Sequence, residues 1–211
     1  MKKDSEELVK TCHACQVLRD AIHTHPNVLQ DMSTPWPFHT WGLDLIGPIN
    51  HHSNGHIWIL AAIEYFTKWL EAISLKKATR VAVANFIWGH IITRFGIPRR
   101  LISDNGTPFI NRNIKKLTEA YYIRHGRSTP YYSQGNGQAK VTNRVILKIL
   151  KKMKHECGGK WSDHLTDVLW VCMSSLKTTM RFSPFSLVYG TKAISLVELV
   201  IPMPRVVLKE N

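Results

Sequence analysis

Long apolar runs, cysteines and acidic residues are all scarce in this sequence. No stretch of about 18 consecutive apolar residues occurs, which argues against a transmembrane helix. The chain starts with Met1, Lys2 and Lys3 rather than with an apolar segment, so we expect no secretory signal peptide. Four cysteines among 211 residues are too few for a disulfide scaffold. These absences predict a soluble protein in a reducing, intracellular compartment.

The shortage of acidic residues leaves a large positive charge. Lys and Arg number 28 against 15 Asp and Glu, a formal net charge of +13 at pH 7. A polyanionic partner such as nucleic acid is the natural inference from this imbalance. The alternative, a basic protein that is merely soluble, stays open at this point because charge alone names no function.

Composition divides the chain into a long central segment and two shorter ends. With 44% hydrophobic content in 211 residues, the chain is long enough for one domain with a substantial core. Residues 1–34 are polar and rich in histidine, and Pro35 and Pro37 then interrupt regular structure. We therefore expect a boundary there, a main domain over residues 35–195 and a tail over residues 196–211.

The main domain is predicted to be a mixed α/β fold. Three β-like runs, Trp41–Ile46, His56–Ile63 and Trp69–Leu75, with a turn signal at Asn54-Gly55, indicate an antiparallel meander. Alternating helical and strand patterns follow it, with helices expected over 79–95, 111–122, 138–155 and 161–176, and strands over 99–103 and 122–126. The order βββαβαβαα predicts a five-stranded mixed sheet flanked by helices.

Three segments carry the chemistry and lead to a family resemblance. They are Trp41-Gly42-Leu43-Asp44, Ile102-Ser103-Asp104-Asn105-Gly106-Thr107 and Gln134-Gly135-Asn136-Gly137-Gln138-Ala139-Lys140. From about Cys12 to Pro202 the chain resembles the integrases of Gypsy-type LTR retrotransposons, especially those of plants. Further matching stretches, in the same order as in that family, are 62–69, 94–98, 129–132 and 182–190. The resemblance implies a ribonuclease H-like catalytic core and an association with DNA integration.

The family uses two aspartates and a glutamate, and this chain supplies only the two aspartates, Asp44 and Asp104. Phosphodiester cleavage and strand transfer use two Mg²⁺ or Mn²⁺ ions about 3.5–4 Å apart, which carboxylates hold. The family leaves 35 residues between its second Asp and its Glu, and 35 residues separate Asp104 from Lys140. Lys140 therefore occupies the glutamate position, and the chain looks like a degenerate copy whose metal binding is weak or absent.

Two hypotheses concern the consequences of this replacement. The first is that Lys140 forms an ion pair with Asp44 or Asp104 and takes the place of the metal ions; the alternative is a solvated helix lysine, which still leaves the glutamate missing. The second is that a neighbouring carboxylate substitutes for the glutamate. Glu64 is the nearest candidate by strand pairing, although a structural role for it is favoured.

Cys12 and Cys15, with His13 and Ala14 between them, look like the second half of the family's HHCC zinc-binding module. The family's two histidines precede the cysteine pair, and only 11 residues precede Cys12 here. Structural zinc needs four ligands, so we expect an unmetallated remnant without zinc. His13, His23 and His25 are spare imidazoles and leave an accidental site as the alternative.

The family resemblance also implies DNA contacts from the long helix and the loop before it. Sequence-independent contacts to phosphates are expected from basic side chains, with polar contacts from the loop. The expected residues are Lys115, Lys116, Gln134, Asn136, Gln138, Arg144, Lys148, Lys151 and Lys152. A run of lysines is otherwise a solvated helix face, so the prediction concerns the set more than its members.

Three functional readings follow from the sequence. The first is an integrase core that binds nucleic acid but has lost strand transfer. The second is residual metal-dependent nuclease or integrase activity that uses Asp44 and Asp104. The third is a non-catalytic interaction module that keeps only the family's homodimer interface. The family also implies a nuclear location and no membrane partner.

Overall fold

The computed structural model describes residues 7, 11–12, 34–128 and 136–194, and the architecture below is that of the long ranges within the unit Met32–Asn211. A five-stranded sheet with the order β3-β2-β1-β4-β5 forms its centre. The strands are β1 (Thr40–Ile46), β2 (Trp58–Glu64), β3 (Leu70–Leu75), β4 (Arg100–Ser103) and β5 (Arg124–Arg127). The predicted meander is confirmed, because β1 pairs antiparallel with β2 and β2 with β3.

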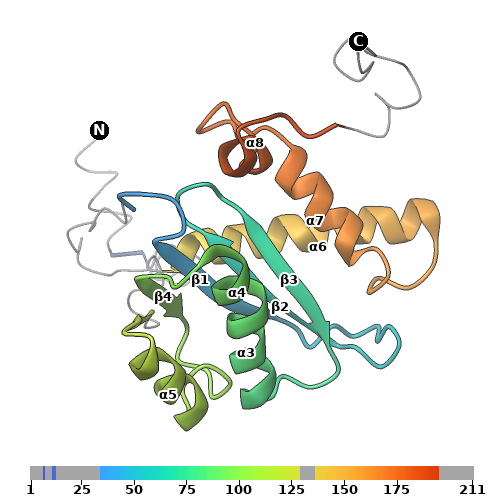
Figure 1. The fold of residues 1–211 in the computed structure, drawn as a ribbon. Coiled ribbons are helices and arrows are strands. Elements are labelled where there is room, and N and C mark those ends of the chain that lie inside the picture. Colours follow the sequence, from blue (N-terminus) through green and yellow to red (C-terminus); the bar gives the residue numbers. More distant parts are fainter. Residues whose placement is uncertain (1–6, 8–10, 13–33, 129–135, 195–211) are drawn as a thin grey trace. The chain divides into compact units, whose positions relative to one another are not determined.

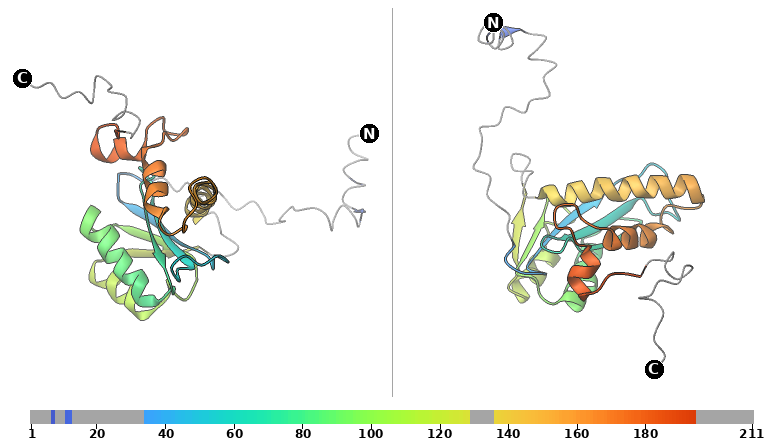
Figure 2. Two further views of the ribbon diagram at one scale, coloured as in Figure 1. Left: turned by 90° about the vertical axis from the view of Figure 1, so that its right-hand side faces the viewer. Right: turned by 90° about the horizontal axis from the view of Figure 1, so that it is seen from above.

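Helices cover both faces of the sheet. They are α3 (Arg80–Phe86), the π-helix η1 (Ile87–Ile92), α4 (Thr93–Phe95), α5 (Arg112–Ala120), α6 (Gly137–Cys157), α7 (Leu165–Ser174) and α8 (Pro184–Tyr189). Figure 1 shows α3, α4 and α5 in front of the sheet and the long helix α6 behind it, and the side view in Figure 2 separates the two layers. The five-stranded mixed α/β fold expected from the sequence is therefore observed.

Alternation along each strand assigns side chains to one of two cores. Ile46 of β1 and Ile102 of β4 pack with the buried stripe of α6 and with α7. Trp41, Leu43 and Leu101 point the other way and pack with α3, η1 and α5. We call these the α6 face and the α3 face. Because neighbouring side chains along a strand alternate, the parity of a strand residue decides which layer it meets.

Local signals explain where several elements begin. The Thr79 side chain accepts a hydrogen bond of 3.2 Å from the Ala82 backbone N–H and so caps α3. Asn54 and Gly55 both have positive φ and form the predicted turn. The part of the sequence predicted as one regular helix after Thr79 instead includes the π-helix η1, and the helix expected from Trp161 begins at Leu165.

The sequence prediction missed the short helix α8. Ser183 caps it by accepting from the Ser186 N–H at 3.1 Å, Pro184 occupies its first turn, and Gly190 ends it in the left-handed conformation. Tyr189 of α8 packs edge-on against Trp69, with ring centroids 5.6 Å apart. No helix in the described ranges is long and apolar enough to span a bilayer.

Candidate active site

Asp44 lies near the end of β1 on the α6 face and is only 9% exposed. Its Oδ1 accepts a hydrogen bond from the Leu45 backbone N–H at 3.1 Å, and its Oδ2 accepts from Asn143 Nδ2 of α6 at 2.9 Å. Burial raises the pKa of Asp44, and the charge of Asp104 adds to this effect, while the hydrogen bonds and the charge of Lys140 oppose it. Asp44 is therefore a carboxylate held in an unfavourable, low-dielectric position.

Asp104 follows β4 and belongs to the same site. Strands β1 and β4 are parallel neighbours, so the ends of both strands lie at one edge of the sheet. The Asp104 Oδ1 accepts from the Gly106 backbone N–H at 2.9 Å, which folds the loop around the carboxylate. A Cβ on Gly106 would lie 2.9 Å from that oxygen, so this close approach favours glycine.

Lys140 lies in the first turn of α6 and is exposed. Its charge acts on Asp44, and Asn143, three residues further along the helix, bonds Asp44 directly. The hypothesis of a direct ion pair is not supported, because no salt bridge in the described ranges joins Lys140 to Asp44 or Asp104. The long, exposed side chain influences Asp44 through its charge without forming a salt bridge with it.

The arrangement of these residues agrees with what sequence comparison finds. Residues 35–133 match the family described as the integrase core domain. Over this stretch, which is just under half of the chain, the sequence is similar to an integrase core domain. The matched region includes β1 with Asp44 and the β4 loop with Asp104, whereas Lys140 lies beyond it.

Known polyproteins share similarity over most of the chain. The Gag-Pol polyprotein of avian reticuloendotheliosis virus is 28% identical over 191 residues, which cover 89% of this chain and 16% of the polyprotein. The transposon Tf2-3 polyprotein of Schizosaccharomyces pombe is 25% identical over 202 residues, which cover 94% and 15%. The chain thus spans less than a fifth of the length of these relatives.

Solved structures support the ribonuclease H-like fold of the integrase core. The simian T-cell lymphotropic virus intasome in complex with PP2A regulatory subunit B56 gamma contains a chain that matches with a TM-score of 0.68 and 17% identity, covering 92% of this chain and 69% of that one. The HTLV-2 integrase catalytic core domain in complex with magnesium matches with a TM-score of 0.60 and 18% identity, covering 73% and 98%.

The described residues do not fit a site for two magnesium ions. Asp44 and Asp104 are oxygen ligands of the type that Mg²⁺ prefers. No group of three His, Cys, Asp or Glu side chains in the described ranges is arranged to hold a metal ion. Position 140 in the first turn of α6, where the sequence analysis predicted the family's glutamate position, carries Lys140.

Glu64 does not lie beside Asp44. It pairs in register with Trp41 rather than with Asp44, whose partner is Ala61, and its parity directs it to the α3 face. Its carboxylate is fully buried and accepts from the Phe66 N–H at 2.9 Å and from both the N–H and the hydroxyl of Thr67 at 2.6 Å. Glu64 therefore stabilises the turn between β2 and β3, as favoured from the sequence.

Asn136 and Gln138, which we predicted to contact DNA, instead attach the start of α6 to the sheet. Asn136 is fully buried, donates to the Leu43 carbonyl at 2.9 Å and accepts from the Tyr65 hydroxyl at 3.2 Å. The Gln138 side chain accepts from Lys68 Nζ at 2.6 Å. The prediction is wrong for Asn136, because a fully buried amide is inaccessible to DNA, and Gln138 is half-buried and engaged by Lys68.

This attachment depends on the glycine of the Trp-Gly-Leu-Asp motif. A Cβ on Gly42 would lie 2.5 Å from the Tyr65 ring, so only glycine leaves room for the ring to lie against β1. Burial raises the pKa of Tyr65, which keeps its hydroxyl protonated as a donor to Asn136. Gly42 thus supports the position of α6 relative to Asp44.

The basic residues predicted to contact DNA are divided between the two faces of the domain. Lys115 and Lys116 are exposed on α5 on the α3 face, and Lys115 pairs with Glu119 at 3.7 Å. The others lie on α6, where a spacing of three or four residues aligns exposed side chains along one stripe. We call this stripe the α6 ridge; it comprises Lys140, Arg144, Lys148, Lys151 and Lys152.

Other predicted residues fall partly outside the described residues. Cys15 and the spare histidines His13, His23 and His25 lie there, so the zinc remnant formed by Cys12 and Cys15 stays a prediction. Gln134 of the loop before α6 also lies outside them.

Sequence reasoning also missed Asn143, although a signal was present. Asn143 interrupts the apolar stripe of α6 formed by Ala139, Ile146 and Leu150. A polar residue on a buried stripe needs a hydrogen-bond partner, and here the partner is Asp44.

Proposed function

We propose that this chain is the integrase core of a Gypsy-type retrotransposon that binds DNA but is impaired in phosphodiester cleavage and strand transfer. The observation that carries the proposal is the position of Lys140, in the first turn of α6 with its charge acting on Asp44. Replacing a carboxylate by an ammonium changes a nominal pocket charge of −3 to −1. Metal ions there lose one attraction and meet one repulsion.

The site keeps its structure despite this replacement. Asp44 is held by Leu45 and Asn143, and Asp104 is held by its own loop. Burial disfavours the ionised form of Asp44, and no metal ligand on α6 offsets that cost at position 140. A site formed in this way is stable as a fold element and poor as a metal centre.

DNA binding is proposed to use the α6 ridge. Arg144, Lys148, Lys151 and Lys152 are exposed on one stripe of a 21-residue helix, and the chain carries a net charge of +13. Such side chains contact phosphates without reading sequence. Lys140 extends the ridge to the edge of the carboxylate site, so the substitution exchanges metal binding for one more phosphate contact.

The test of impairment is a cleavage and strand-transfer assay on duplex DNA ends in Mg²⁺ or Mn²⁺. We expect no product from the wild type, product from Lys140→Glu, and none from the control Lys140→Gln, which removes the positive charge without adding a ligand. Product from the wild type that disappears in Asp44→Asn would instead establish the alternative, a residual nuclease or integrase.

The DNA-binding part is tested separately by the salt dependence of affinity. The slope of log K against log salt is negative, and each lost phosphate contact reduces its magnitude by about 0.9 for duplex DNA. We expect Lys148→Glu/Lys151→Glu to weaken binding and lower the slope by about 2. Salt-independent binding, or an unchanged slope in this variant, would contradict a phosphate-contacting ridge.

Self-association and location complete the proposal. The HTLV-2 integrase catalytic core has been solved in a trimeric and a dimeric form, and we propose a homodimer for this core and a nuclear site of action. Light scattering of the full chain with and without DNA tests the proposed homodimer. A dimer that binds no DNA would favour the third reading, a non-catalytic interaction module.

A further inference from the structure

A cavity of about 670 Å³ lies on the α6 face, between the sheet and the helices α6 and α7. Its wall is largely apolar and is formed by Ile63 of β2, Leu70 of β3, Val141 and Val145 of α6, and Cys172 of α7. Cavities of this volume with a few polar groups are typical of sites for small molecules.

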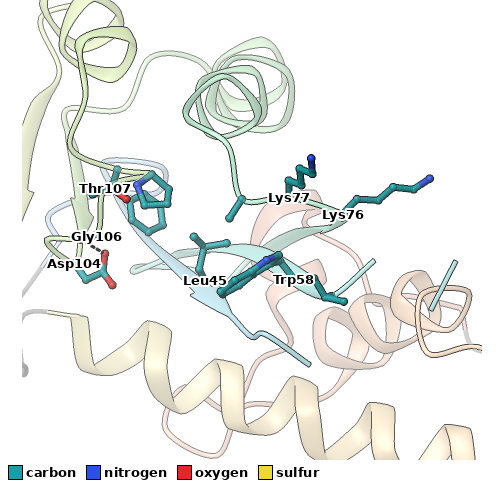
Figure 3. Close-up of a pocket in the computed structure, with 11 residues that line it drawn as sticks. Leu45, Trp58, Lys76, Lys77, Asp104, Gly106 and Thr107 are labelled. Carbon is teal, nitrogen blue, oxygen red and sulfur yellow. Dashed lines mark hydrogen bonds between the residues drawn. The ribbon is translucent and has the colours of Figure 1, made fainter. Parts of the chain in front are cut away.

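The cavity is separate from the candidate active site. Ile63 pairs with Leu70 of the edge strand β3, whereas Asp104 follows β4, on the other side of β1. Figure 3 shows the pocket that does belong to the site, with Asp104 and Gly106 in its wall. The two pockets share no lining residue, so a ligand in the cavity would not occupy the carboxylate site.

Lys68, in the connection between β2 and β3, brings a half-buried positive charge to the cavity. Its Nζ donates to the Tyr65 carbonyl and to Gln138 Oε1, both at 2.6 Å. An ammonium group has three donors, and these two acceptors are neutral. No salt bridge joins Lys68 to a carboxylate within the described ranges. Burial lowers its pKa, an effect that the charge of Glu64 opposes.

Lys177, which follows α7, brings a second positive charge to the same cavity. Its side chain is half-buried and makes no salt bridge in the part of the chain that the structure describes. Burial raises the pKa of the Cys172 thiol, and the charge of Lys177 opposes this rise. The ammonium group therefore lies close enough to act on the cavity wall. Two cations without a carboxylate partner form the complement of an anion.

The opposite part of the wall favours an apolar group. Val141 and Val145 lie one turn apart on α6 and remain 60% and 42% exposed. Covering such aliphatic side chains removes apolar surface from water, which is favourable in proportion to the area buried. The cavity thus combines a cationic end with an aliphatic wall.

We propose that this cavity binds a small amphipathic carboxylate, with its carboxylate at Lys68 and Lys177 and its apolar body against Val141 and Val145. A medium-chain fatty acid and an aromatic carboxylic acid share this chemistry. A doubly charged phosphate ester matches less well, because burying its second charge against an apolar wall is more costly. The inference is independent of DNA binding and of cleavage.

The test measures binding of sodium octanoate and of 1-naphthoate to the full chain by isothermal titration calorimetry. We expect one site per chain for at least one of the two acids, and binding of the neutral analogue 1-octanol about tenfold weaker than that of octanoate. Lys177→Gln should weaken carboxylate binding about tenfold, because it removes a charge-assisted hydrogen bond. The matched control Lys77→Gln removes the same charge at an exposed lysine outside the cavity and should not change the affinity.

Lys68→Gln should also weaken binding about tenfold, but this variant loses the bonds to Tyr65 and Gln138 as well. Circular dichroism checks that it folds. Lys177 has no side-chain hydrogen bond to lose in the described ranges, so Lys177→Gln decides the test if Lys68→Gln does not fold. Valine methyl NMR locates the ligand, since octanoate should shift the Val141 and Val145 signals.

The outcomes separate the possible occupants. Binding of octanoate alone identifies a fatty acid as the ligand class, and binding of 1-naphthoate alone identifies an aromatic acid. The proposal is overturned if neither acid binds, if Lys177→Gln binds both as the wild type does, or if the methyl shifts lie elsewhere. Signals of Val141 and Val145 that respond to protein concentration and not to the acids would assign the cavity to a second copy of the chain instead.

Discussion

Asp44 and Glu64 are acidic residues on neighbouring strands of one sheet, and their surroundings differ. Glu64 is fully buried on the α3 face, and its carboxylate accepts three hydrogen bonds from the turn that follows it. Asp44 is buried on the α6 face with two donors, the charge of Asp104 nearby and a raised pKa. The comparison teaches that a buried carboxylate whose bonds are satisfied supports the fold, whereas one in an unfavourable environment marks a functional site.

The largest expected effect is on Glu64. Glu64→Gln places an amide NH₂ against buried N–H donors, so we expect a loss of about 3 kcal/mol in the free energy of unfolding. Urea denaturation of the full chain measures it, with Asp44→Asn as the matched control because the chemical change is the same. Equal losses in the two variants would erase the distinction between the carboxylates.

A smaller loss in the free energy of unfolding is expected from a change at Asn136. Like Glu64, Asn136 is buried and its side chain is hydrogen-bonded within the fold. Asn136→Ala removes the donor to the Leu43 carbonyl and the acceptor of the Tyr65 hydroxyl. We expect a loss of about 2 kcal/mol, with unchanged DNA affinity at temperatures where the variant is folded. A variant of full stability that binds DNA more weakly would restore Asn136 as a DNA contact.

Asp44→Asn is expected to act in the opposite direction, raising the free energy of unfolding at pH 7 by about 1 kcal/mol. The folded pKa of Asp44 lies above its ordinary value of 3.8. As the pH rises from that value, the unfolded chain loses its proton first, so wild-type stability falls until the folded pKa is passed. Thermal melting from pH 3 to pH 8 should show the two proteins diverging as pH rises. If the free energy of unfolding of the wild type instead rose relative to that of Asp44→Asn as the pH increases, the raised pKa would be contradicted.

The smallest effect concerns Lys140, whose charge lowers the pKa of Asp44. Lys140→Gln should therefore raise that pKa further, which NMR titration of the Asp44 side-chain carbon would detect. Lys148→Gln, two turns further along the ridge, is the control and should change it less. An unchanged pKa in Lys140→Gln would mean that the lysine has no electrostatic influence on the site.

Much of the fold was predictable because its signals are local. Short β-like runs predicted β1, β2 and β3 close to their observed bounds, and Asn54-Gly55 and Thr79 predicted a turn and a helix start. The π-helix Ile87–Ile92 was not predicted, because π-helices are rare and the apolar spacing was interpreted with the α-helical period. The helix α8 had cap signals but is too short for a periodic pattern.

The candidate site was predictable only in part. Motifs and spacing identified Asp44, Asp104 and the position of Lys140, and basic composition predicted a polyanionic partner. The role predicted for Asn136 was wrong, because a polar residue in a predicted loop looks exposed until its partners are known. Glu64 was proposed as a neighbour by strand pairing, although the side-chain parity of the two strands separates it from Asp44.

The sequence by itself determined most of the elements, the residue types available for chemistry and the presence of a lysine at position 140. These depend on short-range backbone preferences and on counting along the chain. Only the tertiary structure decided that Asn143 bonds Asp44, that Glu64 faces the other layer and that Lys68 and Lys177 line one cavity. These relations join residues far apart in the sequence, and they arise because packing buries some polar groups with partners and leaves others at the surface.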